Sequence, residues 1–273
     1  IGVLKALEEE GIVPDYITGV SMGCFVGGLY AVGYSADSLE HIVRNTDWTA
    51  ILSGDMSEKD VIFEEKKAFR QELLNMPVRD WKISPPNSLI QGQQISAMLQ
   101  YYTYPVATIN DFDSLDIPFK TVAVDIETCV PVIFESGNLS DALRASMAIP
   151  SAFSAIEIDG RLFVDGGMIH NFPVQEALDM GADFIIGSYT GRELYKKDEL
   201  NSMTAIMAQI SSFSGILDSE KEKAKVDLLI EHEFGDISLM DFNMADSLIK
   251  IGYESAQKQI QELRKVRSSN SHR

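Results

Sequence analysis

Tyr16-Ile-Thr-Gly-Val-Ser-Met-Gly-Cys-Phe-Val-Gly-Gly-Leu-Tyr30 predicts a short apolar strand, a tight turn centred on Ser21 and a following helix. Within this stretch, Gly19-Val-Ser-Met-Gly23 fits the G-x-S-x-G pattern of a nucleophile elbow, in which small flanking residues let the chain reverse sharply. The N-terminal amides of the helix point at the same place and would stabilise an oxyanion there. A tight turn with a purely structural role is the alternative interpretation.

Strands and helices alternate along the rest of the chain. Apolar runs predict strands at 119–126, 131–135 and 184–188, and Asp159-Gly160 is typical of a two-residue hairpin turn. Apolar residues from 203 to 213 fall on one helical face, and a longer helix is expected over 241–265. The pattern predicts a single α/β domain over residues 1–267, followed by a disordered tail over 268–273.

Composition excludes several classes of partner. The chain of 273 residues carries 41 acidic and 23 basic side chains, which give a formal net charge of -18. Nucleic acid is therefore not an expected partner, and general attraction to an anionic bilayer is not available. The two cysteines, Cys24 and Cys129, provide neither a disulfide framework nor a metal cage and are expected to be buried, and no metal is predicted.

The region from 55 to 89 has the least regular pattern. It mixes lysine and arginine with phenylalanine, leucine, methionine and tryptophan in an otherwise acidic chain. A solvated face is one interpretation of this region, and a lid that meets an interface is the other.

An activated serine needs a base, and three candidates follow the elbow in the sequence. Asp165 comes at the end of a predicted strand, where Gly166 and Gly167 leave room beside it. Burial beside the elbow would raise the basicity of this carboxylate above its ordinary value. His170 and His232 are the alternatives, and either would complete a Ser/His/Asp esterase.

Several ordered motifs together resemble the patatin-like phospholipases, a family that includes the related catalytic domain of cytosolic phospholipase A. The resemblance extends over the following segments: Ile1-Gly-Val-Leu-Lys-Ala-Leu-Glu8, Gly19-Val-Ser-Met-Gly23, Val124-Asp-Ile-Glu-Thr128, Ala145-Ser-Met-Ala-Ile-Pro150, Asp165-Gly-Gly167, Asn171-Phe-Pro-Val174 and Gly181-Ala-Asp183.

The resemblance implies a three-layer fold, with a central, mostly parallel sheet covered by helices on both faces. It implies a lipid acyl hydrolase, of the phospholipase A or lysophospholipase type, that needs no metal or organic cofactor. Ser21 would be the nucleophile and Asp165 the general base. In the family, a glycine-rich loop supplies most of the oxyanion hole; here it would precede Ile1, which leaves the backbone amide of Met22 as the donor within this sequence.

A non-catalytic lipid-binding scaffold with the same fold is the alternative from a different class. The resemblance implies a lipid or phospholipid ester as the partner, with transient contact to a membrane or micelle. Relatives of this kind occur in the cytoplasm and as exported passengers of larger outer-membrane proteins, so both compartments stay open.

Overall fold

The computed structural model describes residues 1–53, 92–150, 153–235, 237 and 241–270, together with two short strands at 78–79 and 82–83. The lid expected over 55–89 lies outside the described residues, apart from those two strands. They pair antiparallel as β2 (Val78–Arg79) and β3 (Lys82–Ile83).

Helices account for most of the regular structure that surrounds the sheets. The α-helices are α1 (Gly2–Glu9), α2 (Met22–Val32), α3 (Ala36–Asn45), α4 (Trp48–Ser53), α6 (Gln93–Thr103), α7 (Leu139–Ser146), α8 (Val174–Asp179), α9 (Met203–Lys223), α10 (Ala245–Lys258) and α11 (Ile260–Asn270). Short 3₁₀ turns occur at η1 (Tyr104–Val106), η2 (Phe112–Ser114), η3 (Gly166–Met168) and η4 (Phe242–Met244).

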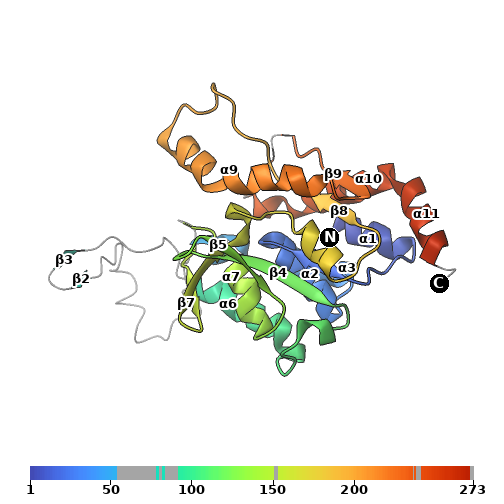
Figure 1. Cartoon of the computed structure of the whole chain (residues 1–273), viewed down its shortest axis with the longest axis horizontal. Helices are drawn as coiled ribbons and strands as arrows, with labels where there is room; N and C mark the ends of the chain where they lie inside the picture. Colours follow the sequence, from blue (N-terminus) through green and yellow to red (C-terminus); the bar gives the residue numbers. More distant parts are fainter. Residues whose placement is uncertain are drawn as a thin grey trace.

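The remaining strands form a five-stranded sheet and a separate pair. The five are β1 (Ile17–Gly19), β4 (Phe119–Asp125), β5 (Val130–Phe134), β6 (Ile156–Ile158) and β7 (Arg161–Asp165), and the pair is β8 (Ile186–Tyr189) with β9 (Leu228–Glu231). Strand β4 is the centre of the larger sheet, since β1, β5 and β7 all pair with it. In Figure 1, α9 runs along the top of the molecule and α6 lies toward the opposite edge, with β4 and β5 between them.

The register along β4 brings the carboxyl ends of strands β1 and β7 together. Thr121 pairs with Gly19 of β1 and with Phe134 of β5, so β1 and β5 occupy opposite edges of β4. Ala123 pairs with Asp165 of β7 on the edge that β1 uses. Because β1 runs parallel to β4 and β7 antiparallel, their carboxyl ends meet on this edge. The segment after Gly19 therefore begins beside Asp165.

Four clusters of buried apolar residues hold the described elements in place, and two of them are much larger than the others. The larger lies among α2, α3, α6, α7 and the start of β4, and its fully buried members include Phe25, Leu29 and Phe119. A Cβ on Gly27 would lie 2.9 Å from the Ile17 side chain, so the glycine lets α2 pack close to the sheet. The smaller of these two clusters joins α1, β9, α10 and α11.

The α/β architecture with flanking helices is confirmed, but the prediction of a mostly parallel sheet is wrong for the pairings described. Only β1–β4 and β8–β9 are parallel among them, and the other pairs are antiparallel. For the hairpins β4–β5 and β6–β7 the physical reason is connection length. Residues 126–129 join β4 to β5 too tightly for a crossover, which a parallel pair requires. Cys129 lies in that turn and is exposed, so its predicted burial is also wrong, whereas Cys24 is buried.

The C-terminal helix differs in detail from its prediction. Residues 241–265 are helical for most of their length, but α10 ends at Lys258 and α11 begins at Ile260. Helix α11 continues to Asn270, into the tail that was predicted to be disordered from residue 268. Residues 271–273 lie outside the described part of the chain.

Candidate active site

Ser21 occupies a strained turn between β1 and α2. Its φ of 54° and ψ of -127° lie in a region that side-chain-bearing residues rarely adopt, and such strain is typical of functional turns. It is the N-cap residue of α2, so the first amides of that helix lie beside it. The Ser146 hydroxyl accepts a hydrogen bond from the Ser21 amide at 3.0 Å and fixes the turn from α7. The predicted elbow geometry is therefore present.

Asp165 lies at the end of β7, with only 5% of its surface exposed. Its Oδ1 accepts a hydrogen bond from the Gly167 amide at 2.7 Å. Burial raises the pKa of Asp165 to about 6, although hydrogen bonds from the Ser21 side chain and the Gly167 amide act in the opposite direction. The structure thus brings the two residues singled out in the sequence together, and it gives the carboxylate a raised basicity.

Glycines in both motifs are required by close backbone approach. A Cβ on Gly19 would lie 2.6 Å from the Gly23 carbonyl oxygen, and one on Gly166 would lie 2.3 Å from the Val122 carbonyl oxygen. A Cβ on Gly167 would lie 2.5 Å from Asn171 Oδ1. Gly23 differs, because a Cβ there would meet no atom within 4 Å, so no described neighbour requires its small size.

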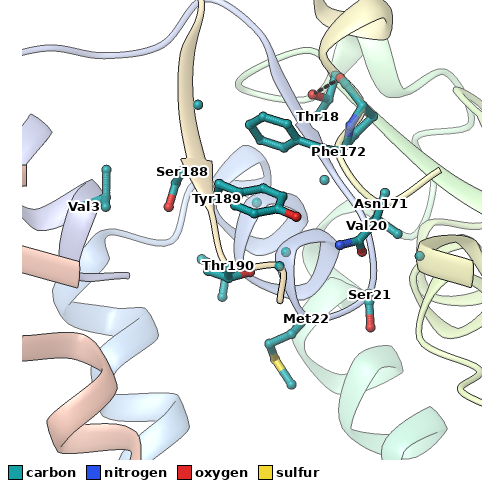
Figure 2. A pocket seen from close by; sticks show the side chains of 18 of the residues that line it. Val3, Thr18, Val20, Ser21, Met22, Asn171, Phe172, Ser188, Tyr189 and Thr190 are labelled. Atoms are coloured by element: carbon teal, nitrogen blue, oxygen red, sulfur yellow. Dashed lines mark hydrogen bonds between the residues drawn. The ribbon is translucent and has the colours of Figure 1, made fainter. Parts of the chain in front are cut away.

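A large open cavity of about 1550 Å³ contains both Ser21 and Asp165. Apolar side chains from α2, the segment after α7 and the segment before α8 line much of it, including Val26, Ile149 and Phe172. Figure 2 shows Val3 and Ser188 across the cavity from Ser21 and Met22. The site has largely apolar walls, as ligand pockets do, with polar side chains such as Asn171 and Ser188 among them.

His170 does not contact Ser21 in the structure. Its Nδ1 lies 2.5 Å from Asp218 Oδ2 on α9, and its Nε2 lies 2.9 Å from Glu176 Oε2 on α8. Burial disfavours the charged imidazolium, but hydrogen bonding and attraction from Glu176 and then Asp218 outweigh this effect and raise the pKa of His170 to about 9. A cation held between two carboxylates cannot accept a proton, so this geometry does not support His170 as the base.

His232 lines the cavity but is bonded to a different serine. Its Nε2 lies 2.9 Å from the Ser188 hydroxyl, and its buried Nδ1 has no hydrogen-bond partner. Burial lowers its pKa, so the ring is neutral at pH 7. Within the described part of the chain, no hydrogen bond joins either imidazole to Ser21.

Sequence analysis gave Ser146 no role, although it lies within one of the motifs quoted above. Its contact with the Ser21 amide spans 125 positions and depends on where α7 packs. A polar residue in the apolar run before Pro150 is the signal that could have identified it. Ser146 is fully buried, as expected for a hydroxyl that satisfies a backbone amide.

Metal-binding clusters and membrane-spanning helices are both absent from the described residues. These residues contain no group of three or more His, Cys, Asp or Glu side chains arranged to bind a metal ion. None of their helices combines the length and the apolar character that crossing a membrane requires.

Comparison with known proteins identifies the family. The family pattern described as patatin-like phospholipase matches residues 1–178. An uncharacterized NTE family protein of Mycobacterium tuberculosis is 31% identical over 194 residues, which cover 71% of this chain and 46% of that protein. The human patatin-like phospholipase domain-containing protein 6 is 29% identical over 195 residues, or 71% of this chain and 12% of that protein.

Two other similarities extend the comparison. Lysophospholipase NTE1 of Meyerozyma guilliermondii is 26% identical over 196 residues, which cover 70% of this chain and 12% of that protein. The crystal structure of VipD from Legionella pneumophila superposes with a TM-score of 0.50 at 14% identity, over 96% of this chain and 64% of that one. The matched regions span less than half the length of these curated relatives. With the family match covering well over half of its residues, the chain belongs to the patatin-like phospholipase family.

Proposed function

We propose that this protein hydrolyses acyl ester bonds of lipids through an acyl-serine intermediate, with Ser21 as nucleophile and Asp165 as general base. The observation that carries the proposal is the strained Ser21 turn beside a buried carboxylate whose pKa is raised to about 6. A carboxylate with this pKa is ionised at pH 7, yet it is a better proton acceptor than an ordinary aspartate.

In the first step the Ser21 hydroxyl attacks the ester carbonyl and Asp165 takes the proton. The tetrahedral oxyanion forms near the N-terminus of α2, where the Met22 amide is the expected donor. The proton then passes to the leaving alcohol, which departs and leaves acyl-Ser21. Asp165 next activates a water molecule, which releases the fatty acid and restores the serine.

Relatives and cavity support a lipid substrate. One similar protein is a lysophospholipase and another carries a patatin-like phospholipase domain, and the apolar walls around Val26 and Phe172 suit an acyl chain. A phospholipid or lysophospholipid ester is therefore the proposed substrate class. A glycine-rich loop upstream of Ile1 stays the predicted source of further oxyanion donors.

The test is Ser21→Ala in the full-length protein, assayed on a soluble chromogenic ester and on lysophospholipid. Hydrolysis should fall at least about 10⁴-fold, because the variant lacks the proposed nucleophile. Ser188→Ala is the matched control, since it removes a hydroxyl from the same cavity and should leave the rate unchanged.

Other outcomes would contradict the proposal. Retained activity in Ser21→Ala would exclude the acyl-serine route. Loss of activity in His232→Gln, with Asp165→Asn still active, would favour the Ser/His/Asp esterase that uses His232. A natural protein that hydrolyses no acyl ester at all would favour the lipid-binding scaffold.

A further inference from the structure

The outer face of α9 carries an exposed apolar stripe. Its members recur at helical spacing, and their exposed fractions lie between 41% and 74%. The stripe consists of Met203, Ile206, Met207, Ile210, Phe213 and Leu217. They cover an arc of about 120° on a helix of 3.6 residues per turn, the width that normally faces a protein core.

The side of α9 that faces the protein carries mostly small residues, whereas an ordinary amphipathic helix carries large apolar residues on that side. Gly215 and Ser219 are buried there, and Ala208 and Ser212 line the cavity. A Cβ on Gly215 would lie only 2.1 Å from the Gly167 carbonyl oxygen, so close packing on the Asp165 loop requires a small residue. Apart from Ile216, which is buried, small residues thus face inward on this part of α9 and large apolar residues face outward, an arrangement that folding alone does not explain.

The charge pattern indicates what the stripe meets. From Met203 to Leu217 the helix has no Asp, Glu, Lys or Arg, although 23% of the whole chain is charged. With a net charge of -18, the protein would be repelled by an anionic surface. An uncharged apolar face on such a protein fits a neutral surface, and flexible methionines adapt to a fluid one.

The stripe is continuous with the candidate active site. Met207 belongs to the stripe and also lines the cavity that holds Ser21 and Asp165. Arg192, also a lining residue, donates hydrogen bonds to the Ala208 carbonyl at 3.2 Å and to Ser212 Oγ at 2.7 Å, which tie the preceding loop to α9. Through Met207, an acyl chain that leaves a lipid aggregate at the stripe would have an apolar contact that continues into the cavity.

We infer that the outer face of α9 docks on the surface of neutral, zwitterionic phospholipid aggregates and delivers acyl chains to the cavity. The delivery step rests on the proposed function, whereas the docking itself does not. In Figure 1, α9 lies along the upper side of the molecule.

The experiment measures binding without hydrolysis. Full-length Ser21→Ala protein is sedimented with phosphatidylcholine vesicles, alone and with Ile210→Gln and Phe213→Gln added. The added pair should weaken partitioning at least about tenfold, because two large apolar side chains no longer enter the lipid. Binding should persist when salt is raised and should not require anionic lipid.

The matched control places Tyr101→Gln and Tyr104→Gln in the same background. These side chains are at least as exposed as the stripe but lie on α6 and η1, so vesicle binding should be unchanged. In active protein, Ile210→Gln with Phe213→Gln should hydrolyse a soluble monomeric ester at the normal rate and should lose rate only on vesicles.

Several results would overturn the inference. These are unchanged vesicle binding after the two α9 substitutions, binding that disappears with salt, or a shift from dimer to monomer caused by those substitutions. Failure of the proposed function is distinguishable, because it would abolish hydrolysis of the soluble ester while Ser21→Ala protein still binds vesicles.

Discussion

Asp165 and His170 are five residues apart on one loop, yet they are buried in opposite ways. Asp165 has hydrogen-bond donors but no paired cation in the described structure, so burial raises its pKa to about 6. His170 lies between Glu176 and Asp218, which hold the imidazole charged and raise its pKa to about 9. The ionised Asp165 has no counter-ion among the described residues, whereas the charged His170 has two, Glu176 and Asp218.

This difference separates a reactive group from a structural one. A buried charge without a counter-ion costs folding free energy, and such a cost is common where a site performs chemistry. A buried imidazolium between two carboxylates instead connects elements, here the loop after Asp165, α8 and α9. We therefore expect changes at Asp165 to affect activity most, and changes at His170 to affect stability most.

The largest effect is expected for Asp165→Asn. Asparagine keeps the shape and can still accept the Gly167 amide, but it cannot take the Ser21 proton, so kcat/KM should fall on the order of 10³- to 10⁴-fold. The same substitution should increase the stability of the fold above about pH 6. With its folded pKa raised, the carboxyl stabilises the fold fully below pH 3.8, and this contribution is lost as the pH rises through about 6.

At pH 8 the ionised Asp165 costs about 3 kcal/mol, so Asp165→Asn should raise Tm by several degrees. Asp159→Asn, the same change in the exposed turn of the same hairpin, is the control and should alter neither rate nor Tm. A variant with full activity, or one that is inactive only because it unfolds, would contradict the assignment.

The next effect is the dependence of the rate on pH. Since Asp165 must be ionised to accept a proton, kcat/KM on an uncharged soluble ester should fall about tenfold for each pH unit below about 6. A stopped assay from pH 4 to pH 8 measures this limb. His232→Gln should leave it in place, whereas an acid limb that shifts in that variant would assign the titration to the imidazole.

Local motifs in the sequence were sufficient to predict the elbow and the Asp165 loop. A glycine whose backbone approaches nearby backbone, such as Gly19 beside Gly23, leaves a signature within the motif itself. The hairpin turn at Asp159-Gly160 was equally local, and both residues have the positive φ that such a turn requires.

Long-range features could not be predicted in the same way. That β1 and β7 share one edge of β4, which sets Asp165 beside Ser21, depends on strand register. The partners of His170 are Glu176 on α8 and Asp218 on α9. Glu176 is near His170 in the sequence, but nothing there indicates that Asp218 is the second partner. For α9, periodicity showed that apolar residues share a face, but only packing shows that this face is exposed.

The smallest effect on the rate is expected for His170→Gln, which removes the cation and leaves Glu176 and Asp218 facing each other. Because the folded pKa of His170 is raised from 6.5 to about 9, its contribution to stability is fully present below pH 6.5 and is lost as the pH rises through about 9. The contribution is about 1–2 kcal/mol, since solvent screens part of this network. At pH 6 the variant should therefore have a Tm lower by about 3–6 °C, with at most a few-fold loss of rate.

The double variant His170→Gln with Glu176→Gln sharpens this test. Removing one carboxylate relieves the repulsion, so the second change should recover part of the lost Tm, while Glu176→Gln alone should destabilise the protein because His170 loses a partner. Natural protein should lose thermal stability between pH 6.5 and pH 9, and His170→Gln should show a flatter profile over that range. A rate loss for His170→Gln as large as that of Asp165→Asn, with Tm unchanged, would mean that the imidazole takes part in proton transfer and that the two buried groups do not differ as argued.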